Sequence, residues 1–458
     1  MRVTLANPPW QFNNPIKLHP LGLASLGAYL RELGRDSLTL VDLNAEIRSA
    51  KDIIKESLRI VERTEPEVLG LTCWTVQAPF VVEFVKAHKK AHPEVPIILG
   101  GVHASSAAAE ILTMSSADMV VHAEGEYTLA DLLDCLRAGQ PWSDVRGLSW
   151  RHEERVMHSE PREFIKDLDS LPFPAYDLLP AMTTYQAMNR KSVISVMASR
   201  GCVHHCSFCS GGSMWRYQRW RSPENVLSEI EWLRSRYYAG FIRFEDDDLL
   251  CNREWAQRLL GLLAKSPVPF SCLARIDSIQ MDTVESLVAA GCVEIYHGVE
   301  TASPRLWQVL GKGMAKGIDL AGCKNLVKCE IEAGLIPTIS GIIGIPGETA
   351  DEMRATVEFL AELRTFGART QLWILTPYPD TQIVKTYGDH LVKVDRWKEF
   401  SQFDVFSQEA RTAYKKLLKK YKSIVPDNLM FANEAGVRAT GELFLEARGR
   451  LMGVFDFV

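Results

Sequence analysis

The sequence predicts an α/β protein in which two parallel-sheet units follow one another along the chain. Short apolar runs alternate with helical patterns up to residue 137, a proline-rich stretch interrupts them, and a second alternation runs from 191 to 391. A chain of 458 residues allows two or three domains, and its 47% hydrophobic and 24% charged residues are an ordinary globular mix.

The first unit, residues 1–137, is expected to form a doubly wound, Rossmann-like parallel sheet. Apolar runs of strand length alternate with amphipathic runs of ten or more residues, as in strands joined by crossover helices. In such sheets ligands bind beyond the carboxyl ends of the strands. The expected strands are 1–7, 37–44, 67–73, 95–101 and 117–125, and the expected helices are 21–34, 50–63, 78–91, 105–114 and 126–137.

Residues 138–190 read as a linker, because they are rich in Pro, Trp and charge and contain three prolines within 172–180. One short hairpin is expected there. From 191 to 391 six strand–helix units follow, too few for a closed eight-unit barrel, so a partial (β/α)6 barrel is predicted. Residues 392–458 are expected to form a charged, helical C-terminal region. The expected barrel strands are 191–202, 241–247, 269–276, 292–300, 336–346 and 368–379, and the helices are 223–237, 253–264, 281–290, 319–333 and 350–366.

Composition excludes several classes of function. The net charge is −5 and no basic block is present, which excludes nucleic acid as a partner. No apolar run reaches the length of a membrane span, and the N-terminus lacks a signal-peptide pattern, so a cytoplasmic protein is expected. Seven of the ten cysteines are scattered singly, as buried thiols are in a reducing compartment.

The other three cysteines, Cys202, Cys206 and Cys209, lie together in "SRGCVHHCSFCSGG" (199–212). A structural zinc site takes four ligands in two separated pairs, and the nearby His204 and His205 are too constrained within the loop to complete one. The spacing instead fits three thiolates on three irons of a 4Fe–4S cluster, with the fourth iron open. An open iron can chelate the amine and carboxylate of a small molecule.

This loop resembles the radical S-adenosylmethionine (SAM) superfamily, whose motif is C-x3-C-x-aromatic-C, with Phe208 as the aromatic residue. The resemblance implies that SAM chelates the open iron. It also implies that one electron, supplied by a donor such as flavodoxin or ferredoxin, cleaves SAM. The deoxyadenosyl radical so formed would remove a hydrogen from a small-molecule substrate.

Four later segments resemble the subgroup with an N-terminal cobalamin-type domain: "WRYQRWRSPENVLSEI" (215–230), "FEDDDLL" (244–250), "HGVETAS" (297–303) and "IIGIPGET" (342–349). All lie at expected carboxyl ends of strands, where barrel chemistry is built.

The charges of SAM suggest roles for residues in and near these segments. Glu300 suits the ammonium or ribose of SAM, and Arg275 suits its carboxylate. Gly344 and Gly347 let the backbone approach the adenine.

The substrate side has its own candidates. Glu245 and Asp248, with Asp380, could hold a cationic amine of the substrate. Tyr217 is a further candidate catalytic residue.

Residues 93–112 and 117–133 resemble a cobalamin-binding domain, in which Gly100, Gly101, His103 and Glu124 occupy motif positions. The sequence departs from the pattern at Ser105, at Ala123 and in lacking a proline before the next helix. The motif that offers a histidine to cobalt is also missing, so His103 is expected to be a hydrogen-bonding loop residue. The domain is therefore either a cobalamin site or a scaffold that has lost its cofactor.

Two reactions fit. The first and favoured one is cobalamin-dependent C-methylation by a radical methyltransferase. The alternative is cobalamin-independent dehydration or rearrangement of a polar substrate such as an aminoglycoside-type diol. An electron carrier would need four protein ligands, and methylthiotransfer expects three further cluster cysteines in the first domain, where only Cys73 and Cys135 occur.

Overall fold

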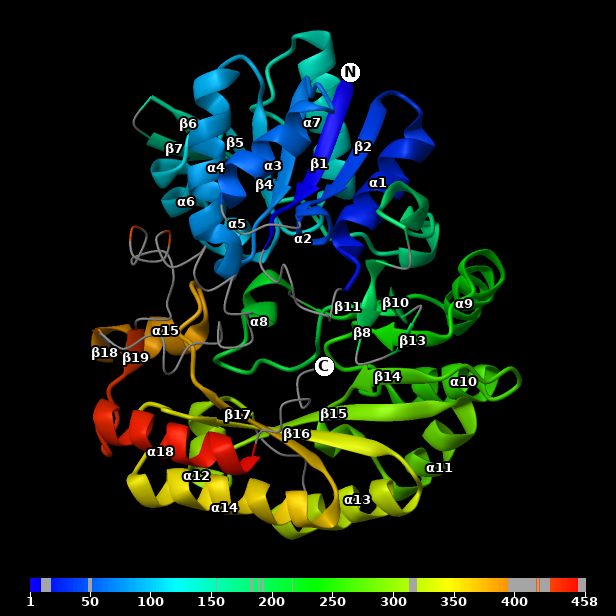
Figure 1. The fold of residues 1–458 in the computed structure, drawn as a ribbon, viewed down its shortest axis with the longest axis vertical. Coiled ribbons are helices and arrows are strands. Elements are labelled where there is room, and N and C mark those ends of the chain that lie inside the picture. The colour runs from blue at the N-terminus through cyan, green and yellow to red at the C-terminus, as the bar shows by residue number, and fades with distance from the viewer. Residues whose placement is uncertain are drawn as a thin grey trace. The chain divides into compact units, whose positions relative to one another are not determined.

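The computed structural model describes residues 1–9, 18–47, 52–153, 155–181, 184–187, 190–191, 193–215, 217–312, 319–393, 417, 420 and 429–451. These residues form two compact units (Figure 1). The first comprises the described residues up to Gln186 together with Leu417 and Lys420. The second comprises those of 187–393 and 429–451.

The first unit is built on one sheet of strand order β2-β1-β3-β4-β5-β6-β7. The first five are parallel neighbours, and the direction of strand addition reverses between β1 and β3. This reversal is the topological switch point of a doubly wound sheet. The strands are β1 (Arg2–Asn7), β2 (Ser37–Asp42), β3 (Val68–Thr72), β4 (Ile97–Gly100), β5 (Met119–Val121), β6 (Leu148–His152) and β7 (Arg155–His158).

Helices cover both faces of this sheet: α1 packs beside α7, and α4 packs beside α3 and α6 (Figure 1). Their apolar residues point inward, and Leu23, Leu129 and Leu132 join Val3 and Leu5 in one buried core. One expected helix, 105–114, is instead two, because the chain leaves helical geometry at Ala107. The helices are α1 (Leu21–Leu33), α2 (Leu43–Glu46), α3 (Ile53–Glu62), η1 (Thr75–Gln77), α4 (Ala78–Ala91), α5 (Val102–Ser106), α6 (Ala108–Met114) and α7 (Gly125–Ala138).

The hairpin expected between the two alternations is β6–β7, and it extends the first sheet through antiparallel pairing with β5. The described residues after it contain two short turns of 3-10 helix and a small two-stranded sheet. These are η2 (Leu168–Ser170), η3 (Tyr176–Leu178), β8 (Gln186–Ala187) and β9 (Arg190–Lys191).

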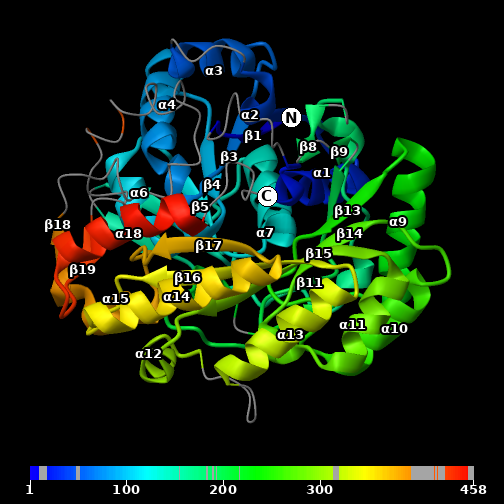
Figure 2. The same cartoon turned by 60° about the horizontal axis from the view of Figure 1, so that its bottom comes forward.

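The second unit holds six parallel strands in chain order, as the prediction of a partial barrel requires. Because each strand is added on the same side, right-handed crossovers place the connecting helices on one face. Figure 2 shows α13 and α14 lying side by side over that face. The strands are β10 (Val193–Val196), β13 (Phe241–Phe244), β14 (Phe270–Leu273), β15 (Cys292–Glu300), β16 (Ile336–Ile343) and β17 (Arg369–Ile374).

Capping explains several helix boundaries in this unit. Ser222 accepts from Asn225 N at the start of α9, and Thr349 and Glu352 form a capping box at the start of α14. The helices are α8 (Ser210–Met214), α9 (Pro223–Tyr237), α10 (Arg253–Leu263), η5 (Ile276–Ser278), α11 (Met281–Ala290), α12 (Pro304–Val309), α13 (Leu320–Glu332), α14 (Ala350–Phe366), α15 (Gln382–Tyr387), η6 (Gly388–His390) and α18 (Val437–Leu451).

Three further pieces complete the second unit. Strands β11 (Ser199–Arg200) and β12 (Arg219–Trp220) pair across the ends of the cysteine loop, and β18 (Leu391–Lys393) pairs with β19 (Leu429–Phe431). Helix α18 packs on α14 and β17. The helix expected within 409–424 falls almost wholly outside the described residues. No helix in the described part of the chain is long and apolar enough to cross a membrane.

Candidate active site

The three-cysteine loop runs from β11 to α8 at the carboxyl end of the second sheet. Its middle is fixed by Ser207, whose backbone N–H donates to Leu310 O and whose hydroxyl donates to Val309 O, both at 2.8 Å. Ser207 O in turn accepts from Ile383 N at 2.8 Å. Phe208 packs against the apolar cluster that includes Leu306 and Leu310. The loop is thus held by elements that follow it by about a hundred residues or more.

Burial opposes ionisation of the thiols in this loop, and backbone N–H groups aimed at sulfur offset part of that cost. Burial raises the pKa of the Cys202 thiol to about 11, and the backbone N–H of His204 opposes the rise. Burial also raises the pKa of Cys209, and the N–H groups of Gly211 and Gly212 oppose it. Backbone donors aimed at sulfur are what iron-bound thiolates use.

The sulfurs do not form a site for a single ion. Among the residues that the structure describes, no three His, Cys, Asp or Glu side chains are arranged around one metal ion. In a 4Fe–4S cluster each thiolate binds a different iron, so the three sulfurs need not converge.

Cys206 lies beside two buried cations. Arg275, at the end of β14, points its NH1 at Cys206 Sγ at 3.6 Å. Burial raises the pKa of Cys206, whereas the positive charges of Lys312 and Arg275 lower it. Both cations are themselves paired, Lys312 with Glu300 and Arg275 with Asp277.

Glu300 ends β15 with a positive φ of 69°, a conformation that a non-glycine residue rarely adopts. Its carboxylate accepts from Lys312 Nζ at 2.6 Å and from Ser340 Oγ at 3.2 Å. A Cβ on Gly298 would lie 2.0 Å from Glu300 Oε1, so the folded-back carboxylate requires glycine there. Strain of this kind concentrates at functional sites.

The acidic stretch after β13 is bound mainly to the protein itself. Asp248 is fully buried, and its oxygens lie near Ser278 Oγ at 2.9 Å, His204 Nε2 at 3.3 Å and Arg275 N at 3.4 Å. Asp248 therefore ties the cysteine loop to the region after β14.

Two neighbours of Asp248 are arranged in similar ways. Asp246 accepts from Ser199 Oγ and Ala198 N, and burial raises its pKa to about 7. Glu245 accepts from Ser195 Oγ at 2.7 Å and Arg243 Nε at 3.0 Å.

Two other candidates are Tyr217 and Asp380. Tyr217 has a 43% exposed side chain, and its ring lies 5.5 Å from the Arg219 guanidinium carbon. Asp380 has a positive φ of 62° and pairs with Lys385 at 2.6 Å.

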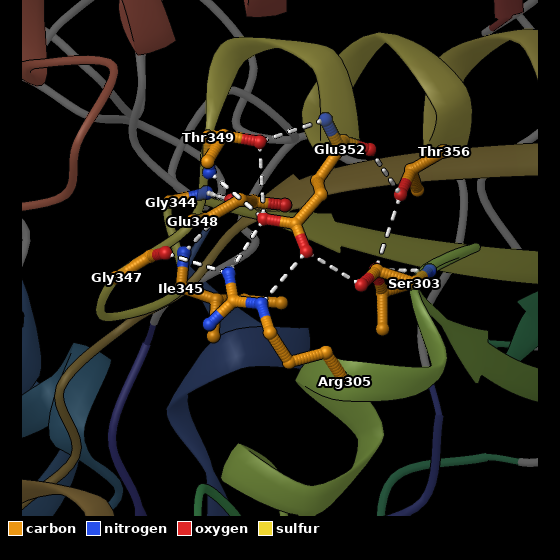
Figure 3. A network of polar contacts seen from close by, with 10 residues as sticks. Ser303, Arg305, Gly344, Ile345, Gly347, Glu348, Thr349, Glu352 and Thr356 are labelled. Carbon is orange, nitrogen blue, oxygen red and sulfur yellow. Dashed lines mark hydrogen bonds and ion pairs between the residues drawn. The ribbon is translucent and has the colours of Figure 1, made fainter.

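The turn after β16 holds two carboxylates with opposite properties (Figure 3). Glu348 Oε2 accepts from Gly344 N at 2.6 Å and Ile345 N at 3.0 Å, while its buried Oε1 has no partner among the described residues. Burial raises the pKa of Glu348 to about 8. Gly344, at φ 81°, gives the turn its left-handed bend.

Glu352, one helical turn later, is held by Arg305 through Nε at 3.0 Å and NH2 at 2.6 Å (Figure 3). Ser303 Oγ donates to the same carboxylate at 2.7 Å. The Arg305 guanidinium lowers the pKa of Glu352 to about 2. This fork connects α12 to the start of α14 and so shapes the rim of the site.

In the first unit, a polar network marks the switch point between β1 and β3. Asn7 donates to Asp42 Oδ1 at 2.8 Å and accepts from Gln77 Nε2 at 3.1 Å. Tyr185 also donates to Asp42, at 2.9 Å. Trp74, just beyond β3, is 50% exposed and offers a flat apolar surface at this end of the sheet.

The expected cobalamin-site residues follow β4 and β5. Gly101 has a φ of 94°, and a Cβ there would lie 2.9 Å from Thr72 Oγ1, so close packing explains this glycine. A Cβ on Gly100 would touch nothing closer than 3.8 Å.

His103 is buried, and its Nδ1 lies 3.3 Å from Thr75 Oγ1, the loop hydrogen bond expected of it. Its Nε2 has no partner among the described residues, and burial lowers the pKa of His103 to about 4. Glu124, also buried, accepts from Ile165 N at 2.7 Å. His103 is thus a buried, neutral imidazole with one nitrogen unpaired within the described part of the chain.

Three site residues were missed by sequence reasoning: Asp277, Lys312 and Glu348. Asp277 lies only two residues from Arg275, a spacing that could have suggested the pair. Lys312 comes from the segment after α12, and nothing in the local pattern links it to Glu300. Glu348 belongs to the quoted "IIGIPGET" segment, but its burial is visible only in the structure.

Comparison with known proteins identifies both units. Residues 15–133 match the family model of the B12 binding domain, and residues 196–360 match that of the radical SAM superfamily. An uncharacterized methyltransferase of Pyrococcus horikoshii is 32% identical over 393 residues, covering 84% of this chain and 82% of the relative. The chain belongs to the radical SAM superfamily. It is one of the radical SAM enzymes that also carry a B12-binding domain.

Two other similar proteins extend the comparison. An anaerobic magnesium-protoporphyrin IX monomethyl ester cyclase of Rubrivivax gelatinosus is 25% identical over 394 residues, covering 82% of this chain and 67% of the relative. A solved structure of the radical SAM methyltransferase TsrM from Kitasatospora setae, with cobalamin and a 4Fe–4S cluster bound, superposes with a TM-score of 0.72. It is 18% identical and covers 99% of this chain and 89% of that one, which shows a shared fold.

Proposed function

We propose that this radical SAM enzyme methylates a carbon of a small-molecule substrate and uses cobalamin to do so. One observation carries the proposal: a complete three-cysteine loop stands in the same chain as a B12-binding domain. The similarity to a methyltransferase across more than four fifths of the chain supports it. Radical dehydration or rearrangement is not favoured.

The residues around the loop can hold a cluster. We assign Cys202, Cys206 and Cys209 as its thiolate ligands, with Phe208 packing the loop against α12. When bound, the 4Fe–4S cluster supplies the electron that cleaves SAM, and cobalamin supplies the methyl group. The protein would hold the thiolates and offer backbone N–H donors to the sulfurs of Cys202 and Cys209.

SAM would lie between the cysteine loop and the ends of β15 and β16. Glu300 is a buried carboxylate there and is suited to the ammonium or ribose of SAM. Gly344 and Gly347 keep the turn after β16 free of side chains.

For the substrate, Glu245 and Tyr217 are better placed than Asp248. Both Glu245 and Tyr217 retain exposed surface, with a quarter of the Glu245 side chain open to solvent. Asp248, in contrast, is fully buried and already bonded to the protein.

Cobalamin would bind at the carboxyl end of the first sheet. The switch point and the exposed Trp74 support this position. Gly100, where an added Cβ would meet only Val121 O at 3.8 Å, would leave room for a flat ligand, whereas Gly101 and Glu124 would support the surrounding loops.

We infer a separate role for each part of the chain. Residues 1–137 bind cobalamin, 138–190 link the two parts, 191–391 bind the cluster and SAM, and 392–458 form a C-terminal region. A flavodoxin or ferredoxin would donate the electron. None of the ten cysteines, all of which the structure describes, forms a disulfide, and this suits the reducing cytoplasm.

The two coproducts of SAM test the reaction. Methylation through cobalamin consumes two SAM molecules per turnover: one becomes deoxyadenosine, and the other gives its methyl group and leaves as S-adenosylhomocysteine. We expect both products in about equal amounts when the reconstituted enzyme is given methyl-labelled SAM, hydroxocobalamin, reductant and candidate substrate pools. Label should enter a third, methylated product.

The Cys209→Ala variant is the matched control and should abolish deoxyadenosine, whereas Cys292→Ala should leave both coproducts. Deoxyadenosine without S-adenosylhomocysteine, and without label in any product, would contradict methyl transfer. That result would favour a radical dehydration, rearrangement or cyclisation as the reaction of this enzyme.

A further inference from the structure

The Arg275 guanidinium is fixed on one side and presented to sulfur on the other. Its Nε and NH2 donate to the two oxygens of Asp277, each at 2.8 Å, which is a bidentate fork. The remaining nitrogen, NH1, lies 3.6 Å from Cys206 Sγ. Side chains of both Arg275 and Asp277 are less than a tenth exposed. The fork therefore sets the direction in which NH1 points.

This geometry argues against the role that charge alone suggested for Arg275. A guanidinium recognises a carboxylate best through two parallel N–H bonds, and Asp277 already takes that edge. NH1, which is not part of this fork, is directed toward the Cys206 sulfur. The main chain is also tethered, because Arg275 N lies 3.4 Å from Asp248 Oδ1.

We propose that Arg275, oriented by Asp277, donates a hydrogen bond to the Cys206 thiolate of the cluster and thereby raises the cluster's reduction potential. The inference rests only on the cluster part of the proposed function and is independent of methyl transfer. Asp277 acts through Arg275 and is a positioning residue.

The physical reason is the charge that reduction adds. One electron makes the cluster and its thiolates more negative, so a positively charged donor stabilises the reduced form more than the oxidised form. Burial strengthens the effect, because little solvent is present to screen it. Removing the donor should therefore make the cluster harder to reduce.

The test is a redox titration of the reconstituted cluster, followed by electron paramagnetic resonance without SAM or substrate. For Arg275→Gln we expect the ratio of reduced to oxidised cluster at a fixed potential to fall about tenfold, equivalent to a midpoint about 59 mV more negative. Arg275→Lys should also lower the midpoint, because an ammonium cannot bond Asp277 through a fork and reach the sulfur in a fixed direction.

Asp277→Asn separates orientation from charge. If only the lost negative charge of Asp277 mattered, the midpoint potential would rise. If the fork orients Arg275, the midpoint should instead fall, by less than it does in Arg275→Gln. Arg253→Gln is the matched control, because Arg253 forms an exposed Arg–Asp pair with Asp282 at 2.6 Å and should leave the midpoint unchanged.

Iron and sulfide analysis of each protein comes first. A wild-type protein without a 4Fe–4S cluster contradicts the proposed function itself. A loaded Arg275→Gln protein with the wild-type midpoint and weaker SAM binding overturns the inference and makes Arg275 a SAM ligand. If Arg275→Gln does not load, the midpoints of Arg275→Lys and Asp277→Asn decide, and a raised midpoint in the latter removes the positioning role.

Discussion

Lys312 Nζ donates to Glu300 Oε1 at 2.6 Å, and both side chains are less than a tenth exposed. The lysine lies just beyond α12, twelve residues after the strand end that carries the glutamate. A buried carboxylate next to the cluster loop thus has its own counter-ion within the protein. The pair neutralises charge that would otherwise be costly to bury.

Removing the lysine should expose this cost. Lys312→Met leaves the Glu300 carboxylate buried without its cation, and breaking a buried pair in this way typically costs about 3–5 kcal/mol. We expect a clear fall in the free energy of unfolding, measured by urea denaturation at pH 7. The double variant Lys312→Met with Glu300→Gln should be more stable than Lys312→Met alone. Equal stability of the two would show that the charges do not interact.

The cluster should depend on three thiols only. Replacing Cys202, Cys206 and Cys209 together with Ala should remove bound iron and the ability to cleave SAM. Cys292→Ala, at a buried scattered cysteine, should leave both intact. Iron and sulfide analysis with visible absorption makes the comparison. Full iron content in the triple variant would refute the ligand assignment.

Glu352 should stabilise the fold only while it is ionised. Because Arg305 lowers its pKa to about 2, from 4.5, its contribution is present above about pH 4.5 and is lost as the pH falls toward 2. Glu352→Gln should cost about 1–2 kcal/mol at pH 7, since solvent partly screens the half-exposed Arg305. The difference from wild type should shrink between pH 5 and 3 in thermal unfolding.

Glu442→Gln is the control, because Glu442 pairs with Arg438 on the exposed face of α18. It should change stability little at any pH. If Glu352→Gln is less stable than wild type by the same amount down to pH 3, the loss comes from altered packing or hydrogen bonding rather than from the missing charge.

Glu348 should show the opposite dependence. Burial raises its pKa to about 8, so the folded state holds a proton that the unfolded state releases near pH 4.5. Stability therefore falls as the pH rises from about 4.5 to 8. Glu348→Gln mimics the protonated acid and should remove this pH dependence of stability. Its stability relative to wild type should therefore increase as the pH rises. Parallel melting curves of the two proteins at pH 5, 6.5 and 8 would contradict the buried acid.

Regular elements with clear ends were predictable from the sequence. Helices α4, α9, α11 and α14 and strand β15 occupy the expected residues 78–91, 223–237, 281–290, 350–366 and 292–300. For α9 and α14 the capping residues Ser222 and Thr349 fix the first turn, which local sequence specifies. The order of the six barrel strands also follows, because short crossovers join neighbours.

What failed depended on contacts between distant residues. Helix α12 is six residues long, too short for a periodic pattern to reveal. A hairpin was expected within 138–190, but only the pairing of β6 with β5 shows that it belongs to the first sheet rather than to a linker. Tertiary packing places the Lys312 ammonium next to Glu300 and the Asp277 carboxylate against Arg275. A local sequence pattern does not predict such contacts.

The placement of α18 has a consequence for how the chain folds during synthesis. The carbonyl of Leu451 accepts from Thr370 Oγ1 in β17 at 2.8 Å, across 81 residues of sequence. It also accepts from Arg364 NH1 in α14 at 3.0 Å. On the ribosome, β17 can pair with β16 well before α18 emerges. During that interval the apolar sides of β17 and α14 are exposed to solvent. A chaperone or another unfinished chain can then bind them.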